Sequence, residues 1–143
     1  MKLTQISIFL ENKQGRLFDV CSALGKNKIN IRALTIAESE GFGILRIVVN
    51  KPNEAIKVLK AQGFVAQLTE IVAVEVDDRP GGLAGILKVL REAGINVEYM
   101  YGFVEKFSDR ALLVFRFDDP DKAIQVFKRN KVKVIGKNDI KDL

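Results

Sequence analysis

The sequence predicts an α+β protein built from two copies of one βαββαβ module, each folded as a ferredoxin-like sandwich with an antiparallel sheet. Three observations predict this fold. Residues 6–17 align with residues 72–83 at an offset of 66, and residues 29–31 align with residues 95–97 at the same offset. Strand-like and helix-like hydrophobic periods also follow one another in the same order in both copies. We therefore predict two modules, residues 1–69 and residues 70–143.

The first half of each copy is predicted to be a strand, a turn and a helix. Apolar residues alternate over residues 6–10 and 72–76, which is typical of a strand. In the following helix they recur at i, i+3, i+4 and i+7, which predicts one buried face. Its residues are Leu17, Val20, Cys21 and Leu24 in copy one, and Leu83, Ile86, Leu87 and Leu90 in copy two. Gly25 and Gly94 are expected to mark the helix ends, and Cys21 to be a packed thiol.

Each copy continues with two strands, a second helix and a short last strand. The predicted positions are strand starts at Ile29 and Ile95, strands over residues 44–49 and 112–117, helix starts at Pro52 and Pro120, and last strands around residues 64–68 and 132–135. Two extra residues near Ser108 and Asp109 indicate a hairpin loop. A module of about 70 residues is marginally stable alone and has open edge strands. We therefore expect the modules to pair edge to edge, with the helices on one face.

The composition excludes most catalytic classes. The chain has 143 residues, no histidine and one cysteine, so the commonest general base and metal ligand are missing. No phosphate-binding loop or dinucleotide fingerprint occurs, and we expect neither enzymatic activity nor a cofactor or metal. No apolar run is long enough to span a membrane or has the shape of a signal peptide, which predicts a cytoplasmic protein. The net charge of +5 is interpreted as lysine on solvated helix faces.

The turn after the first strand is the candidate binding site. Gly15 and Gly81 allow a positive φ there and the close approach of a ligand. The amides that follow, at Arg16 and Leu17 or at Gly82 and Leu83, open a helix N-terminus that suits a carboxylate. Asn12 or Asp78 would accept from an ammonium group beside it. The alternative, that these residues only build a tight turn and cap a helix, stays open.

Two further asparagines, Asn30 and Asn96, open the second strand of each copy. If the two copies pair through their second strands, each asparagine would face the turn of the neighbouring copy. The predicted site would then lie at the seam between modules.

These motifs carry a family resemblance. Asp78-Arg79-Pro80-Gly81-Gly82-Leu83, followed by Gly94-Ile95-Asn96-Val97, resembles the ACT domain, a regulatory module of amino-acid metabolism. Asn12-Lys13-Gln14-Gly15-Arg16-Leu17 with Ile29-Asn30-Ile31 is similar to the start of valine-sensing regulatory subunits of acetolactate synthase. The resemblance covers nearly the whole chain and is greatest to stand-alone tandem ACT proteins. In copy one, Gln14 replaces the usual proline and a bulky Arg16 follows the glycine.

The resemblance implies a sensor that binds a free amino acid between modules and regulates an enzyme, as a homodimer. The implied ligand contacts are Asn12, Gly15, Arg16, Leu17 and Asn30 in copy one, and Asp78, Gly81, Gly82, Leu83 and Asn96 in copy two. Apolar neighbours favour a branched-chain or aromatic amino acid; they are Leu17, Leu34, Leu83 and Met100, with Tyr99 and Tyr101 nearby.

The alternative function is RNA binding, because tandem RNA-recognition motifs share this topology. Residues 8–12 look like the first-strand signature of that motif, and residues 40–45 like a damaged third-strand signature. Against it, Glu40 stands where a basic residue is expected, and Glu75 in copy two takes the place of Phe9. Nucleic acid is therefore not the expected partner.

Overall fold

The computed structural model describes residues 1–104 and 110–141. Its contacts divide the chain into two compact units. The amino-terminal unit is Thr4–Thr69, and the carboxy-terminal unit combines Met1–Leu3 with Glu70–Leu143. The module boundary expected after residue 69 stays a prediction. The insertion expected near Ser108 and Asp109 lies outside the described residues.

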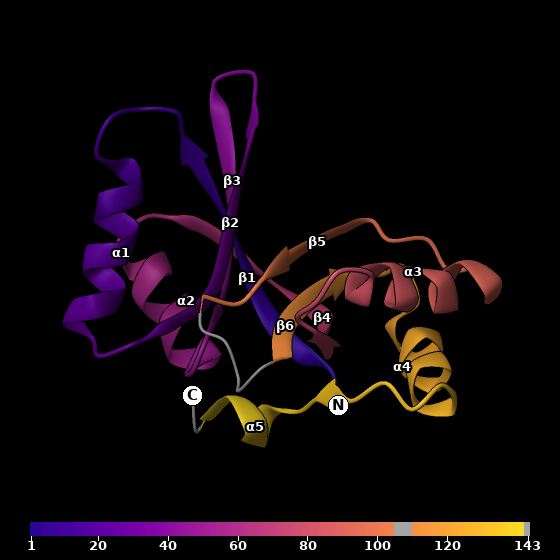
Figure 1. Cartoon of the computed structure of the whole chain (residues 1–143). Helices are drawn as coiled ribbons and strands as arrows, with labels where there is room; N and C mark the ends of the chain where they lie inside the picture. The colour runs from indigo at the N-terminus through magenta and orange to yellow at the C-terminus, as the bar shows by residue number, and fades with distance from the viewer. Residues whose placement is uncertain (105–109, 142–143) are drawn as a thin grey trace. The chain divides into compact units, whose positions relative to one another are not determined.

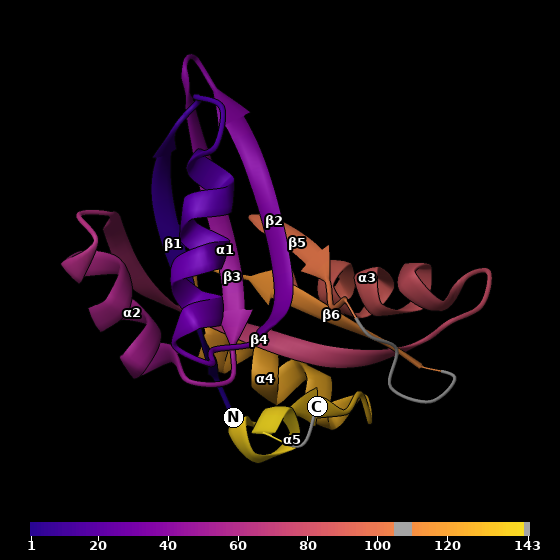
Figure 2. The ribbon, with the colours of Figure 1, turned by 90° about the vertical axis from the view of Figure 1, so that its left-hand side faces the viewer.

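The amino-terminal unit has the predicted βαββαβ order. Its elements are β1 (Leu3–Glu11), α1 (Arg16–Lys26), β2 (Ile31–Ser39), β3 (Phe42–Val49), α2 (Pro52–Ala61) and the first residues of β4 (Val65–Asp77). The strand order is β4-β1-β3-β2, with β3 antiparallel to both β1 and β2. Helices α1 and α2 cover one face of this sheet, as Figure 1 and Figure 2 show. Strand β2 forms its edge.

The carboxy-terminal unit repeats that order. Its elements are the rest of β4, α3 (Gly82–Glu92), β5 (Tyr99–Gly102), β6 (Arg110–Arg116), α4 (Pro120–Arg129), β7 (Val134–Ile135) and α5 (Lys137–Lys141). The strand order is β7-β4-β6-β5, equivalent to that of the other unit. The α+β fold of two βαββαβ modules is thus confirmed. The edge-to-edge pairing of the modules stays a prediction.

Several element bounds differ from the prediction. Residues 65–77 form one unbroken strand, so that β4 closes the first unit and opens the second. Strand β5 begins at Tyr99 rather than Ile95 and has only four residues, whereas β2 has nine. Helix α5 was not predicted from the sequence. The two edge strands of the repeated fold are therefore unequal in length.

Each unit has its own hydrophobic core between its sheet and its helices. In the amino-terminal unit the core is aliphatic apart from Phe64, and Ile6, Ile8, Val20 and Leu24 are buried in it as the periodicity predicts. The prediction that Leu17, Leu83 and Leu87 are buried was wrong, because these side chains are exposed by 37 to 41%. In the carboxy-terminal unit three buried phenylalanines pack together, with ring centroids 5.6 to 6.3 Å apart; they are Phe115, Phe117 and Phe127. Such clusters bury large apolar areas per residue and fix the helices on the sheet.

The first helix of each unit ends in the same way. The Ile29 N–H donates to the Leu24 carbonyl at 3.0 Å, and the Ile95 N–H donates to the Leu90 carbonyl at 2.9 Å. Gly25, which was expected to mark the end of α1, lies inside that helix, so this prediction was wrong. Lys28 instead takes the left-handed conformation, with φ of 58°.

The residue that matches Lys28 in the other unit is Gly94, with φ of 70°. A side chain in the left-handed region costs about 1–2 kcal/mol, and glycine avoids this cost. After the second helices the two residue types are exchanged between the units. The amino-terminal unit has Gly63, with φ of 86°, and the carboxy-terminal unit has Lys131, with φ of 59°. Each unit thus carries one strained lysine at a helix end.

The variant Lys28→Gly should raise the free energy of unfolding by roughly 0.5–1 kcal/mol, because it relieves the left-handed strain. The control Lys26→Gly, inside the last turn of α1, should lower it by about 1 kcal/mol. Urea unfolding followed by circular dichroism measures both. Equal destabilisation by the two variants would contradict the role given to Lys28.

Candidate functional site

The turns between the first strand and first helix of the two units have the same hydrogen bonds. In the amino-terminal unit the Lys13 N–H donates to Glu11 O at 2.7 Å, and the Arg16 N–H donates to Lys13 O at 3.3 Å. In the carboxy-terminal unit the Arg79 N–H donates to Asp77 O at 2.9 Å, and the Gly82 N–H to Arg79 O at 3.0 Å. The offset of 66 therefore extends to the backbone of the candidate site.

Each turn depends on a glycine in the left-handed region. Gly15 has φ of 88° and Gly81 has φ of 86°, and each is the N-cap residue of its helix. A Cβ added at either position would meet no atom within 4 Å. The turns are therefore open to solvent at the glycine.

Gly82 is required for a different reason. A Cβ at this position would collide with the main-chain oxygen of Asp77. Arg16 stands at the matching position, and its guanidinium lies 4.6 Å from the centre of the Phe64 ring and 3.4 Å from Asp19 Oδ2. A cation over an aromatic face is attracted to it. The bulky side chain of copy one is thus held by Phe64 and Asp19.

The free amides of the turns are displaced by one residue from the predicted pair. The Arg16 and Gly82 N–H groups, expected to be free, are bonded within their turns. Among the described residues, the N–H groups of Leu17 and Phe18 have no acceptor, and neither do those of Leu83 and Ala84. Two aligned, unbonded amides at a helix N-terminus suit an anionic oxygen. The sequence reading missed Phe18 and Ala84.

The polar residues beside the turns are exposed. The main-chain N–H of Asn12 donates to Gly41 O at 2.9 Å. Asn12 and Asp78 are both exposed. The neighbouring Glu11 carboxylate has its pKa lowered by a hydrogen bond from Lys13, whose Nζ lies 2.8 Å away. Both turns thus carry an exposed side chain with an oxygen that can accept a hydrogen bond.

The second asparagine of each unit lies far from that unit's own turn. Strand β3 pairs Phe42 with Glu11 at one end and Val49 with Ile31 at the other. Seven residues of strand separate the two ends, which is about 24 Å. Asn30, hydrogen-bonded through its N–H to Asn50 Oδ1 at 3.0 Å, lies beside the far end.

The carboxy-terminal unit has the same arrangement. Strand β6 pairs Arg110 with Asp77 and Arg116 with Tyr99, six residues apart, so Asn96 lies about 20 Å or more from the second turn. The structure thus brings together the predicted site residues of each turn, but not the asparagine of the second strand. A site that contains both needs the asparagine of a second module.

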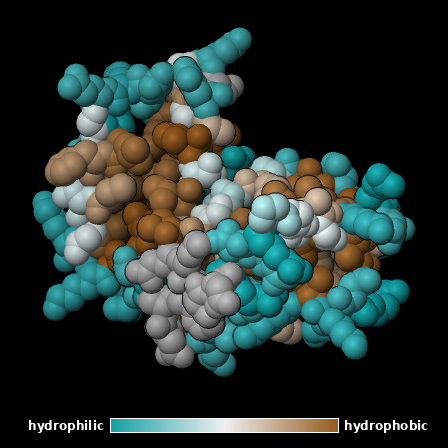
Figure 3. Space-filling view, in the orientation of Figure 1, coloured by the Kyte–Doolittle hydropathy of each residue, from teal (hydrophilic) through white to brown (hydrophobic). Residues whose placement is uncertain are grey.

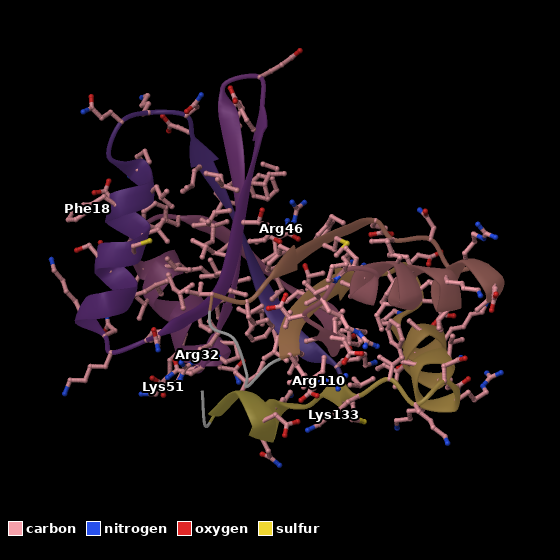
Figure 4. All side chains as sticks on the ribbon, in the orientation of Figure 1. Phe18, Arg32, Arg46, Lys51, Arg110 and Lys133 are labelled. Carbon is pink, nitrogen blue, oxygen red and sulfur yellow. The ribbon has the colours of Figure 1, made fainter. Side chains whose placement is uncertain are left out.

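Apolar side chains are exposed beside the first turn. Figure 3 shows them gathered over α1 and the β2 edge. Leu17, Leu34 and Ile36 are each exposed by 40 to 53%, and Phe18 is 72% exposed and points away from the sheet (Figure 4). Leu83 is exposed in the same way in the other unit, whereas Met100 is half-buried and Tyr101 is buried. Exposed apolar patches of this kind mark interaction surfaces.

Two other groups have structural explanations. Burial raises the pKa of the Cys21 thiol, which is half-buried on α1, so this thiol has little thiolate at neutral pH. Glu75 is buried and forms ion pairs with Arg110 at 3.1 Å and Lys133 at 3.4 Å (Figure 4). The described residues contain no group of three His, Cys, Asp or Glu side chains that could hold a metal ion.

Comparison with known proteins identifies the class to which this fold and these turns belong. The family described as "ACT domain pair" matches residues 1–143, and the chain belongs to this family. No curated protein sequence matches the chain. Among its described residues, no helix is long and apolar enough to cross a membrane.

Solved structures give particular relatives. The chain is similar to protein BT0572 from Bacteroides thetaiotaomicron, with 41% identity, coverage of 100% of this chain and 98% of that one, and a TM-score of 0.93. It shares the fold of the regulatory subunit of aspartate kinase from Thermus thermophilus, with 18% identity, coverage of 88% and 91%, and a TM-score of 0.64. The corresponding subunit from Thermus flavus is 16% identical, with coverage of 88% and 90% and a TM-score of 0.60.

The variant Gly82→Ala should lower the free energy of unfolding by about 1–3 kcal/mol, because the new Cβ collides with a main-chain oxygen and forces the turn to shift. The matched control is Gly85→Ala, at an open position inside α3. It should stabilise the chain by up to about 1 kcal/mol through helix propensity. Thermal and urea unfolding compare the two, and a Gly82→Ala variant as stable as the wild type would contradict the steric argument.

Proposed function

We propose that the chain is a regulatory sensor that binds a free amino acid between ACT modules and thereby controls a partner enzyme. One observation carries the proposal. Each unit presents an open glycine turn with two unbonded helix amides, and keeps its second asparagine at the opposite end of the sheet. These are recognition groups for a zwitterion that only a pair of modules completes.

The chemistry of binding follows from the turns. The α-carboxylate of the ligand would accept from the amides of Leu17 and Phe18, or of Leu83 and Ala84, where the helix dipole adds a partial positive charge. Its ammonium group would donate to Asn12 or Asp78. Gly15 and Gly81 let the ligand come close, since no side chain stands between it and the backbone. Arg16 and Gly82 shape the helix start behind these amides.

A second copy of the chain would supply the neighbouring module. Strand β2 is a nine-residue edge with exposed Leu34 and Ile36, and such an edge is a template for another strand. Antiparallel pairing of β2 with β2 of a second copy would set Asn30 of one copy toward the turn of the other. We therefore propose a homodimer with two equivalent sites at this seam, and sites that use Asn96 in the carboxy-terminal units.

The ligand would be an amino acid with a branched or aromatic side chain, because Leu17 and Leu83 adjoin the turns, and Leu34 and Met100 lie on the second strands that a neighbouring module would bring to them. A ligand biases a partner only by binding two arrangements of the modules unequally. Two proteins with this fold are regulatory subunits of aspartate kinase, which supports an enzyme of amino-acid metabolism as the partner. The chain itself would have no catalytic activity and no cofactor, and would act in the cytoplasm.

RNA binding remains the second candidate because of two exposed aromatic rings. Phe9 and Phe42, 41% and 57% exposed, lie on the sheet face opposite the helices, where RNA-recognition motifs stack bases. Glu11 is the direct neighbour of Phe42 in the ladder and repels phosphate. This surface therefore supports RNA binding less well than the turns support an amino acid.

A thermal-shift screen of all amino acids beside a short single-stranded RNA panel tests the proposal. A ligand at one hundred times its dissociation constant should stabilise the chain by about 2.7 kcal/mol, seen as a rise in Tm. A rise with one amino acid and none with RNA supports the sensor. No rise with any amino acid, together with salt-sensitive RNA binding, would establish the second candidate instead.

A mixed dimer tests whether the site is shared between copies. In a background with Asp78→Ala, to silence the carboxy-terminal sites, Asn12→Ala and Asn30→Ala should each abolish binding. A dimer of one Asn12→Ala copy and one Asn30→Ala copy should regain one site, because one turn and one Asn30 remain intact and face each other. Calorimetry on the co-expressed, dually tagged dimer counts the sites. No binding in the mixed dimer would place each site within a single copy.

A further inference from the structure

Arg32 carries a buried polar atom without a hydrogen-bond partner. It lies at an irregularity of β2, where the pairing with β3 shifts register between Ile31 and Ala33. Its Nε is buried and has no hydrogen-bond partner, and its guanidinium forms no ion pair with another described residue. An unpaired polar group inside a protein costs more than an exposed one, and for a charged group the cost is larger. A hydrogen-bond acceptor from outside the described residues would remove this cost.

The same place in the carboxy-terminal unit is fully paired. Glu98 stands at the position of Arg32, and its carboxylate pairs with Arg116 Nε at 3.6 Å. The position of Arg116 is taken in the amino-terminal unit by Val48, which is buried and apolar. Arg32 therefore has the opposite charge to its counterpart, and the residue that would face it carries no charge.

A second cation stands beside Arg32. The Asn50 N–H donates to Asn30 O at 3.2 Å, so the start of β2 lies next to the residue before Lys51. Figure 4 labels the Arg32 and Lys51 side chains, and both lie at this end of the amino-terminal sheet. Lys51 is exposed and forms no ion pair with a described residue, and Asp119 occupies its place in the other unit. The acidic residue nearest to Lys51 in the sequence is Glu54, in the first turn of α2.

We propose that Arg32 and Lys51 form a binding site for a small oxyanion, a carboxylate or a phosphate. The guanidinium offers a planar pair of N–H donors that matches two oxygens of such an ion, and the ammonium group of Lys51 adds a second charge-assisted bond. The site lies at the opposite end of the amino-terminal sheet from the Gly15 turn. It does not rest on the proposed amino-acid site, and gives the chain a second small ligand.

The experiment uses the full chain in buffers of constant ionic strength. Tm is followed while sodium chloride is exchanged for inorganic phosphate or for succinate. Wild-type Tm should rise and saturate with at least one of the two ions, and the better ion separates a phosphate ligand from a carboxylate ligand. Arg32→Gln should lose the rise, and Lys51→Gln should bind at least tenfold more weakly. The matched control, Lys57→Gln on the exposed side of α2, should keep the wild-type response.

The difference in stability between the wild type and Arg32→Gln should change sign between the two buffers. In chloride buffer Arg32→Gln should be at least as stable as the wild type, because it removes an uncompensated charge. In saturating phosphate or succinate the wild type should be the more stable of the two. A wild-type Tm that follows the chloride control, or an unchanged rise in Arg32→Gln, would overturn the proposal. Lys51→Gln provides the same comparison if Arg32→Gln does not fold.

Discussion

The geometry of both units depends on one constraint, the left-handed glycine at which the first strand turns into the first helix. With φ near 87° at Gly15 and Gly81, the next N–H bonds back into the turn and the following two have no acceptor. A capping side chain would normally satisfy one of them. Helix α4 shows the alternative, since Asp119 accepts from the Lys122 N–H at 3.1 Å. Helices α1 and α3 have no such capping side chain, because a glycine is the N-cap residue of each.

The sequence predicts the parts of the fold that follow from hydrophobic period and repetition. It predicts the burial of Val20 and Leu24 on α1, though not the exposure of Leu17, and it predicts the turns at Gly15 and Gly81 and the βαββαβ order. It does not predict which amide is free, because Phe18 and Ala84 contribute only their backbone, and the choice depends on hydrogen bonds inside the turn. Nor does it predict that Lys28, rather than Gly25, takes the left-handed conformation after α1, because this residue is set by where the Leu24 carbonyl accepts its last hydrogen bond.

Repetition of a backbone does not require repetition of the surface. The two turns have the same hydrogen bonds, yet one follows its glycine with Gly82, where a Cβ collides, and the other with Arg16, held on Phe64. At the far end of the sheet, Arg32 in one unit matches the paired Glu98 in the other. These positions tolerate such changes because they belong to neither hydrophobic core. Two modules with one fold can therefore differ in what they bind.

The separation of the proposed recognition groups would make the proposed sensor depend on more than one module. Within a unit about 24 Å of sheet lies between the open amides and the second-strand asparagine, far more than a free amino acid spans. A ligand that touches both kinds of group must therefore touch two modules. Its affinity then depends on how those modules are placed, and by linkage its binding shifts their placement. Neither unit has to change its own fold for that coupling, because the sensitivity comes from dividing the site between modules.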